Sequence, residues 1–258
     1  MHPRRIFIEP EAPHGDPLHL RGPEAHYLLR VLRLREGDEV NAFDGRGWSC
    51  RAVIVEAGRG VATLSILKSG HAAKPRKAFA VAQAILKAPA MDTVVQMCTE
   101  LGASALIGFH TARSVPRSTG TSGVHQKLER WRKLAIEACR QCRRDFLPAL
   151  RLLPRIEDLG PLISEFDQAL VASLGEGSSL LAALLSSSRV AQSRTLLLIV
   201  GPEGDFSEQE LARLRDFGAV PCALSDAILR AETAAIAGAA LIGQHLLPRT
   251  AGAAPSEQ

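Results

Sequence analysis

Two loops in the last quarter of the chain have the residue types and positions of a ligand site. The first loop, Gly201-Pro-Glu-Gly204, follows the apolar run Thr195–Val200, and the second, Ser225–Thr233, follows Val220–Leu224. Apolar runs of this kind predict buried strands, and ligands in an open α/β sheet bind at the carboxyl ends of strands. The first loop contains a glutamate and continues into Asp205. Two acidic side chains are a poor site for phosphate, so we expect a ligand that is cationic or lacks phosphate.

The glycines of the first loop also have a simpler interpretation. Gly201 and Gly204 permit backbone conformations or close approaches that other residues do not allow, but an ordinary turn between a strand and a helix uses glycine in the same way. A helix is predicted to follow over Ser207–Phe217, because Ser207 and Glu210 form a capping box. The nucleotide-binding motifs G-x-G-x-x-G and G-x-x-x-x-G-K-[ST] do not occur in the sequence.

The net charge of +4 is distributed unevenly along the 258 residues. Residues 1–75 carry 11 basic and 9 acidic side chains, residues 76–150 carry 12 and 5, and residues 151–258 carry 8 and 13, which gives +2, +7 and −5. A positive field concentrated in one third of the chain predicts a polyanionic partner such as a nucleic acid. Arginine supplies 25 of the 31 basic residues. Arginine suits bidentate phosphate contacts, but a biased genome composition gives the same ratio.

The cysteines and the apolar runs limit the class of protein. Five cysteines at scattered positions argue against a disulfide framework. Cys139 and Cys142 have the spacing of a metal or redox pair, but no second pair completes a zinc site, so we interpret the cysteines as reduced thiols and expect no metal. The longest strongly apolar run, Ala234–Ile242, is far shorter than the ~20 residues of a membrane span. The N-terminus lacks the apolar stretch of a signal peptide. We therefore expect a soluble, cytoplasmic protein.

The first 70 residues favour strands. The predicted elements are a strand start at Arg5–Ile8, a helical turn or two at Pro23–Leu32, a hairpin of Glu39–Asp44 with Trp48–Glu56, and a strand at Val61–Leu67. A polar linker, Lys68–Lys77, follows, and we place the domain boundary in it.

After the linker, strands alternate with helices, which predicts βαβ units and a parallel sheet. Besides the two strands above, we expect strands at Phe79–Ile85, Ser104–Phe109 and Ala169–Ser173, and helices at Met91–Leu101, Val124–Phe146, Ser178–Leu185 and Thr233–Leu247. The helix Val124–Phe146 has an apolar stripe and is otherwise basic. Because the charge is one-sided, we expect this face to hold phosphates, and plain solvation of a charged face is the alternative.

The residues of the two loops carry a resemblance. Leu198-Ile-Val-Gly-Pro-Glu-Gly204, then Ser207-x-x-Glu210, then Leu224-x-x-x-Ile-Leu-Arg-x-Glu-Thr-Ala234 resemble the cofactor-binding signature of the SPOUT methyltransferases. More narrowly, they resemble the RsmE family, which methylates N3 of a uridine in 16S ribosomal RNA. The likeness extends from residue 5 to about residue 245 and includes His26–Arg33 with Gly37-Asp38 and Asp44-Gly45, Met91-Asp92, Thr99–Gly102, Arg113-Ser114, Glu137-Ala138, Gln141, Arg144 and Pro148.

The chain departs from the family pattern at several positions. The family usually has glycine where Asp205 and Ser225 stand, which bears on the geometry of the cofactor loops. Positive residues common in the family are replaced by Met97 and Ala227.

The resemblance implies an α/β fold with a SPOUT-type, trefoil-knotted and mostly parallel sheet in residues 73–248. A small PUA-like, RNA-binding β-barrel in residues 1–72 precedes it, and a disordered tail in residues 249–258 follows. It implies S-adenosylmethionine as methyl donor, held by Leu174, Val200, Gly201, Pro202, Glu203, Gly204, Leu224, Ser225, Ile228, Leu229, Ala231, Glu232 and Thr233.

The same resemblance implies a chemistry. Arg230 would stabilise the negative charge that develops on the uracil ring. Glu203 would accept a proton or orient a group, and ordering of its own loop is the alternative for this carboxylate. The base must be unstacked, because N3 lies on its pairing edge.

The partners implied are 16S ribosomal RNA, within the small ribosomal subunit, and a second copy of the chain in a homodimer. The expected phosphate contacts are Arg5, Arg30, Arg33, Arg113, Arg117, Arg140, Arg143 and Arg144. Two alternatives stay open: a SPOUT methyltransferase acting on tRNA or a ribose 2′-hydroxyl, and a non-catalytic RNA-binding assembly factor of the ribosome.

Overall fold

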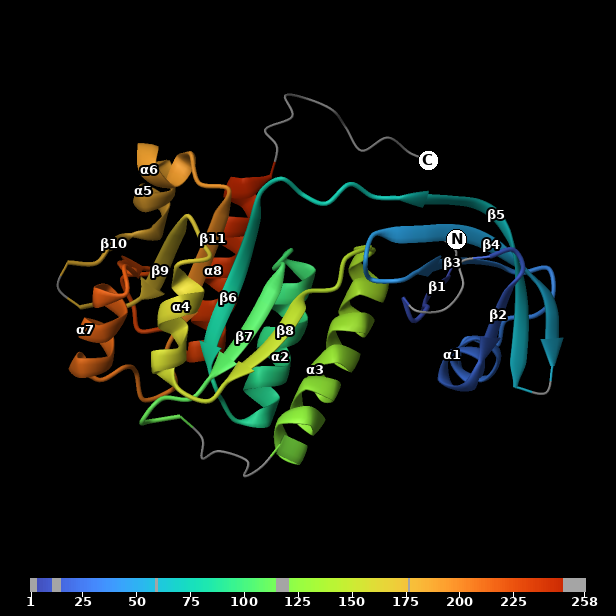
Figure 1. Cartoon of the computed structure of the whole chain (residues 1–258), viewed down its shortest axis with the longest axis horizontal. Helices are drawn as coiled ribbons and strands as arrows, with labels where there is room; N and C mark the ends of the chain where they lie inside the picture. The colour runs from blue at the N-terminus through green and yellow to red at the C-terminus, as the bar shows by residue number, and fades with distance from the viewer. Residues whose placement is uncertain (1–3, 11–14, 59, 115–120, 176, 248–258) are drawn as a thin grey trace. The chain divides into compact units, whose positions relative to one another are not determined.

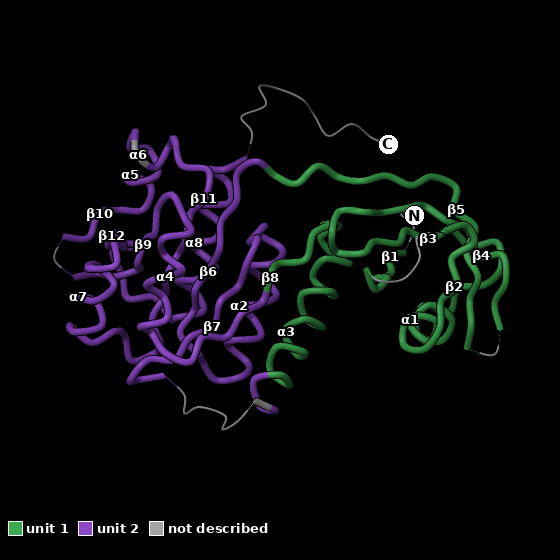
Figure 2. Tube along the Cα trace, viewed as in Figure 1, with its two compact units in different colours: residues 1–75, 125–149 green, residues 76–124, 150–258 purple. Residues whose placement is uncertain are grey.

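The computed structural model in Figure 1 describes residues 4–10, 15–58, 60–114, 121–175 and 177–247. The chain separates into two compact units, one of residues 1–75 with 125–149 and one of residues 76–124 with 150–258 (Figure 2). The division at residue 72 expected from the sequence assigned the long basic helix to the second domain, whereas most of this helix belongs to the first unit. The expected disordered tail lies outside the described residues. Among those residues, no helix combines the length and apolar character needed to cross a membrane.

The first unit is built on a five-stranded sheet with the order β1-β3-β4-β5-β2. β1 and β3 are parallel and the other pairs are antiparallel, so the sheet is mixed. The elements are β1 (Arg4–Phe7), β2 (Leu18–Arg21), α1 (Gly22–His26), the π-helical turn η1 (Tyr27–Val31), β3 (Glu39–Phe43), β4 (Trp48–Gly58) and β5 (Val61–His71). The predicted hairpin is confirmed as β3 and β4. β2 was not predicted, and β5 continues into the first four residues of the expected linker.

Helix α3 (Thr121–Cys142) contacts this sheet through apolar residues near its C-terminal end. Ile136 and Cys139 form a buried cluster with Phe7 and Phe43. The helix ends four residues before the predicted end at Phe146, because Arg143 has a φ of 63° and leaves the helical conformation.

The segment after α3 is held by the turn between β3 and β4. The N–H of Gly47 donates to the carbonyl oxygen of Asp145 at 3.0 Å, and the N–H of Leu147 donates to that of Gly45 at 2.9 Å. A Cβ at Gly47 would lie 2.6 Å from the ring of Phe146, so this close approach requires glycine.

The second unit contains a seven-stranded sheet with the order β10-β12-β9-β11-β6-β7-β8. The pairs from β10 to β7 are parallel, as the alternation of strands and helices predicted. The strands are β6 (Ala78–Ala84), β7 (Ala105–Phe109), β8 (Ala149–Leu153), β9 (Gln168–Ala172), β10 (Ser179–Leu180), β11 (Thr195–Val200) and β12 (Val220–Ala223). β8 was not predicted, and β10 takes the start of the helix expected at 178–185.

Helices cover both faces of this sheet (Figure 1). Along β6, alternate residues Ala80, Ala82 and Ala84 join a core with Leu159 and Leu214 from the helices of one face. On that face lie α4 (Leu159–Ile163), which follows the 3₁₀ turn η2 (Ile156–Asp158), and α7 (Glu208–Asp216). On the other face lie α2 (Ala88–Glu100) and α8 (Ala231–Leu246). Two short helices, α5 (Leu181–Ser186) and α6 (Ser188–Ala191), lie beside β10.

The alanine- and glycine-rich composition of α8 allows it to lie very close to the sheet. A Cβ at Gly238 would be 2.4 Å from the side chain of Leu198 on β11, and one at Gly243 would be 2.9 Å from the carbonyl oxygen of Leu101. Glycine at these two positions lets α8 approach β11 and the end of α2.

Candidate functional site

Three loops leave the carboxyl edge of the seven-stranded sheet. β9 lies between β12 and β11, with Ala172 opposite Cys222, and all three strands are parallel. The segments that follow these strands begin at Ser173, Gly201 and Leu224. The N–H of Ser173 donates to the carbonyl oxygen of Cys222 at 2.9 Å, which joins two of the segments at their start. All the predicted cofactor residues lie in these three loops or directly beside them. The sheet therefore brings these residues together at one edge.

The loop after β11 is a tight turn that begins at a crowded glycine, Gly201, and ends at a residue with positive φ, Asp205. A Cβ at Gly201 would lie 3.2 Å from the ring of Phe206, so a side chain there would crowd the turn. Asp205 has a φ of 60°, and its N–H donates to the carbonyl oxygen of Pro202 at 3.0 Å. Its carboxylate accepts from the N–H of Phe206 at 2.7 Å. This left-handed conformation favours glycine, and aspartate is one of the few other residues that adopt it.

Gln83, at the carboxyl end of β6, was not among the predicted site residues. Its side chain is 1% exposed. Its Nε2 donates to the carbonyl oxygen of Gly201 at 2.8 Å and to that of Ala84 at 3.1 Å. Its Oε1 is buried and has no hydrogen-bond partner among the described residues. Gln83 therefore fixes the start of the first loop and leaves an acceptor available there. A single glutamine in an apolar strand carries no sequence signal for this role.

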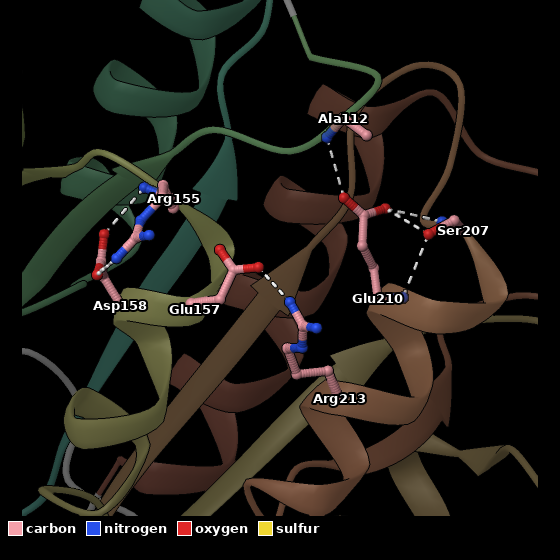
Figure 3. A network of polar contacts seen from close by, with 7 residues as sticks. All are labelled: Ala112, Arg155, Glu157, Asp158, Ser207, Glu210 and Arg213. Atoms are coloured by element: carbon pink, nitrogen blue, oxygen red, sulfur yellow. Dashed lines mark hydrogen bonds and ion pairs between the residues drawn. The ribbon is translucent and has the colours of Figure 1, made fainter.

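Glu210 connects the first loop to the loop after β7 (Figure 3). One carboxylate oxygen accepts from the N–H of Ser207 at 2.8 Å, which confirms the predicted capping box, and the other accepts from the N–H of Ala112 at 3.0 Å. Next to Ala112, the guanidinium of Arg113 donates to the carbonyl oxygen of Gly204 at 2.9 Å. Burial favours a raised pKa for Glu210, but the N–H groups of Ser207 and Ala112, the Ser207 hydroxyl and Arg113 outweigh it and lower the pKa.

The second loop and its neighbour expose apolar side chains. Ile228 is 91% exposed, and Leu174, in the loop after β9, is 49% exposed. The hydroxyl of Ser225 accepts from the N–H of Ala227 at 3.1 Å, so this serine orders its own turn. Arg230 is the exposed N-terminal cap of α8, and no side chain caps this helix end. The first N–H groups of α8 are therefore available to an acceptor, in the positive region of the helix.

The other predicted cofactor and catalytic residues line these loops at different depths. Val200, Gly201, Pro202 and Ala231 are buried, Leu224, Ser225, Leu229 and Glu232 are half-buried, and Glu203, Gly204 and Thr233 are exposed. Within the described part of the chain, neither Glu203 nor Arg230 forms an ion pair. Neither candidate catalytic side chain therefore has a carboxylate or guanidinium partner among the residues that the structure describes.

Two of the arginines expected to contact RNA lie in ion pairs within the first unit. Arg140 donates to both carboxylate oxygens of Glu24, at 2.6 and 2.7 Å, and its guanidinium lies 4.3 Å from the centre of the Tyr27 ring. Arg5 pairs with Asp145. The exposed fractions of the Arg140 and Arg5 side chains are 9% and 10%. Phosphate contact by these two stays an untested prediction. The observed ion pairs join α3 to α1 and β1 to the segment after α3.

The other arginines predicted to contact RNA differ in their exposure and contacts. Arg113 contacts the first loop, as described above, and Arg117 lies outside the described residues. Arg30, Arg33 and Arg143 are exposed and Arg144 is half-buried.

The five cysteines are free thiols, as the sequence predicted. Burial raises the pKa of Cys50 to about 11 and those of Cys98 and Cys222 to about 12. A hydrogen bond with Cys142 and burial raise the pKa of Cys139 above its ordinary value. Among the described residues, no three or more histidine, cysteine or acidic side chains are placed to hold a metal ion together.

Comparisons with known proteins agree with this architecture. The model of the RNA methyltransferase domain matches residues 73–243, and that of the RNA methyltransferase PUA domain matches residues 20–67. Ribosomal RNA small subunit methyltransferase E of Bacillus subtilis is 30% identical over 243 residues, which are 90% of this chain and 92% of that protein.

Two solved structures are similar over nearly the whole chain. A ribosomal RNA small subunit methyltransferase E from Neisseria gonorrhoeae, bound to S-adenosylmethionine, has a TM-score of 0.82 at 25% identity and covers 94% of this chain and 98% of its own. A methyltransferase from Legionella pneumophila, also with bound S-adenosylmethionine, has a TM-score of 0.84 at 25% identity and covers 95% and 98%.

The fold and its matches define a class: an RNA methyltransferase domain that follows a PUA domain. Within this class the chain belongs to the RsmE family, the ribosomal RNA small subunit methyltransferases E. The fold class expected from the sequence is thus confirmed, and the trefoil knot stays a prediction.

Proposed function

We propose that this protein transfers a methyl group from S-adenosylmethionine to N3 of a uridine in 16S ribosomal RNA. The observation that carries the proposal is the convergence of three loops at the carboxyl edge of β9, β11 and β12, with Gln83 and Glu210 fixing the first of them. We assign the knot expected for the family to the segments 200–206 and 224–233.

The residues present fit S-adenosylmethionine. The exposed side chains of Leu174 and Ile228 provide apolar surface that a ligand would remove from water. The Oε1 of Gln83 and the N–H groups at the start of α8 provide an acceptor and donors. The sulfonium is a cation, and residues 151–258 carry a net charge of 8 minus 13, or −5, which suits it. When bound, S-adenosylmethionine supplies an electrophilic methyl group.

The chain itself must position the uracil, remove its N3 proton and stabilise the negative charge that develops on the ring. N3 of uracil carries a proton, so the reaction requires loss of that proton and development of negative charge on the ring oxygens. Arg230, beside the positive end of α8, stabilises this charge. Glu203, exposed on the first loop, accepts the proton or orients the base. The rest of the rate enhancement comes from holding the two reactants in line.

The small ribosomal subunit is the proposed substrate particle, and the chain acts in the cytoplasm as a homodimer. Exposed Leu241 and Leu247 on the last helix and after it provide apolar surface for a second copy. The proposed phosphate contacts are the exposed arginines Arg30, Arg33, Arg113 and Arg143.

Mapping of modified nucleosides in ribosomal RNA tests the function in the cell. A strain that lacks this gene should lose 3-methyluridine from 16S RNA and nothing else, and the wild-type gene should restore it. Loss of a modified nucleoside in tRNA, or of a ribose methyl group, would assign a different RNA substrate. An unchanged modification pattern would favour a non-catalytic assembly factor.

A further inference from the structure

A hollow of about 490 Å³ lies within the first unit, between α1 with η1 on one side and the end of β4 with Gly60 on the other. Its volume falls in the range of roughly 300–1,000 Å³ that is typical of small-ligand sites. Of the residues around it, only Arg30 has a role above, as a proposed phosphate contact. The residues that determine its chemistry are His26, Leu29, Arg30, Leu34, Arg35 and Gly58.

The wall of the hollow combines apolar and cationic groups. Leu29 and Leu34 supply apolar surface, while Arg30 and Arg35 are exposed. In the described part of the chain, no carboxylate pairs with the side chain of either arginine. The one carboxylate of the wall, Glu36, accepts from the N–H of Ala57 at 3.0 Å and so has a structural contact.

The backbone that carries these side chains is unusual. Tyr27–Val31 forms a π-helical turn, with the N–H of Leu32 donating to the carbonyl oxygen of Tyr27 at 2.9 Å. Arg33 follows with a φ of 57°. π-Helical turns occur frequently at functional sites, and a left-handed arginine costs free energy that the surrounding structure must offset. These two irregularities place Leu29 and Arg30, before the bend, and Leu34, after it, around the same hollow.

The arginines at the hollow differ from two other arginines of this unit, because no carboxylate among the described residues pairs with their side chains. Arg5 and Arg140 already meet carboxylates and lie against aromatic rings. Arg30 and Arg35 retain their full capacity for new partners. Free guanidinium groups above an apolar floor suit a ligand that has a flat, weakly polar face and an attached anion, which describes a nucleotide.

We propose that this hollow binds one unpaired nucleotide of the RNA, with its base against Leu29 and Leu34 and its phosphate at Arg30 and Arg35. The identity of the RNA as ribosomal rests on the proposed function. A hollow of this kind favours an unpaired base, because a base in a duplex must first be unstacked and unpaired before it can enter. The site thus selects a single-stranded element of the substrate.

Filling the hollow without changing its charge tests the proposal. A Cβ at Gly58 meets nothing within 4 Å, and its φ is not left-handed, so Gly58→Leu fits the fold and occupies the space. Gly70→Leu, at an equally open position of β5, is the matched control. The full-length variants are titrated with a fluorescently labelled single-stranded RNA without S-adenosylmethionine. Gly58→Leu should raise Kd about tenfold or more, the worth of one stacked base, and Gly70→Leu should leave it unchanged.

Two further probes separate the base from the phosphate. The same RNA with abasic sites should bind the wild-type protein about tenfold more weakly, and Gly58→Leu should not distinguish the two RNAs. Removing both guanidinium groups in Arg30→Ala/Arg35→Ala should reduce the slope of log Kd against log salt by about 0.7, the value for one phosphate contact on a single strand. Free uridine monophosphate should compete only weakly.

Equal affinity of the wild type and Gly58→Leu for the RNA would overturn the proposal. The same loss in Gly70→Leu, or equal binding of intact and abasic RNA, would also overturn it. Tight saturation by free uridine monophosphate at this hollow would make it a nucleotide effector site instead. These titrations are made without methyl donor, so a wild-type protein that binds RNA but transfers no methyl group would refute the proposed function alone.

Discussion

The side-chain amide of Gln83 donates to the carbonyl oxygen of Gly201 at 2.8 Å, and so joins β6 to the loop after β11 across 118 positions of the chain. The amide is buried, so water cannot replace it. The conformation of the first loop therefore depends on Gln83, although its strand, β6, contributes no other predicted contact to the site. We therefore expect Gln83 to act as a positioning residue for S-adenosylmethionine.

Replacing Gln83 should weaken cofactor binding more than it weakens the fold. Gln83→Leu keeps the volume but leaves the carbonyl oxygen of Gly201 without its donor, which costs about 1–3 kcal/mol. We expect calorimetry to show a roughly tenfold or greater rise in the Kd for S-adenosylmethionine. Gln168→Leu is the matched control, because Gln168 is 3% exposed on β9 at the opposite edge of the sheet. Equal cofactor affinity in the two variants would contradict the positioning role.

Glu210 should contribute stability that depends on pH. Its pKa is lowered in the folded chain, so the contribution is full above the ordinary value of 4.5 and is lost as the pH falls through the folded pKa. Glu210→Gln should therefore be less stable than the wild type at pH 7, by about 1–2 kcal/mol, and the difference should shrink below pH 4.5. Urea titrations over this range measure it.

The exposed Glu208, in the same first turn of α7, is the control for Glu210. Glu208→Gln should change the free energy of unfolding by no more than about 0.5 kcal/mol. A Glu210→Gln variant whose deficit is the same at pH 7 and pH 4 would show that the carboxylate does not act through its charge.

Local patterns along the chain could be predicted from the sequence, whereas hydrogen bonds between distant side chains could not. The apolar run Thr195–Val200, the capping box at Ser207 and the hairpin around Gly45 and Gly47 are local patterns, and each was predicted correctly. β2 is only four residues long, so its alternating Leu18 and Leu20 were too weak a signal. The sites of function depend on pairs such as Gln83 with Gly201 and Ala112 with Glu210, which are 118 and 98 positions apart, and no periodicity reports them.

The assignment of α3 illustrates the same limit. Its basic face was visible in the sequence, but Glu24, the partner of Arg140, is 116 positions away. The charge alone therefore predicted an RNA surface, whereas the fold uses this guanidinium in an ion pair.

Breaking this ion pair should destabilise the protein. Burial is the main cause of the raised pKa of Glu24, and Arg140 opposes it, so Arg140→Ala leaves this carboxylate without its compensating charge. We expect a loss of about 3 kcal/mol in the free energy of unfolding. Lys133→Ala, at an exposed position of the same helix, should lie within about 0.5 kcal/mol of the wild type. An Arg140→Ala variant with normal stability and a reduced salt dependence of RNA binding would restore Arg140 as a phosphate contact.

The thiols should be unreactive in the folded protein. The raised pKa values of Cys50, Cys98 and Cys222 keep these groups protonated at pH 8, and burial of Cys139 protects it further. Only Cys142, which is half-buried, should react with Ellman's reagent in the native state, and all five should react in guanidinium chloride. Rapid reaction of two or more thiols in the native protein would contradict this arrangement.

Transfer of a labelled methyl group to isolated small ribosomal subunits tests the central claim most directly. Subunits from a strain that lacks the gene are incubated with methyl-labelled S-adenosylmethionine and the full-length protein, and the RNA is digested to nucleosides. We expect one methyl group per subunit, in 3-methyluridine. Arg230→Ala should lower kcat at least about 100-fold with little change in the Kd for S-adenosylmethionine. Absence of label, or label in any other nucleoside, would contradict the account.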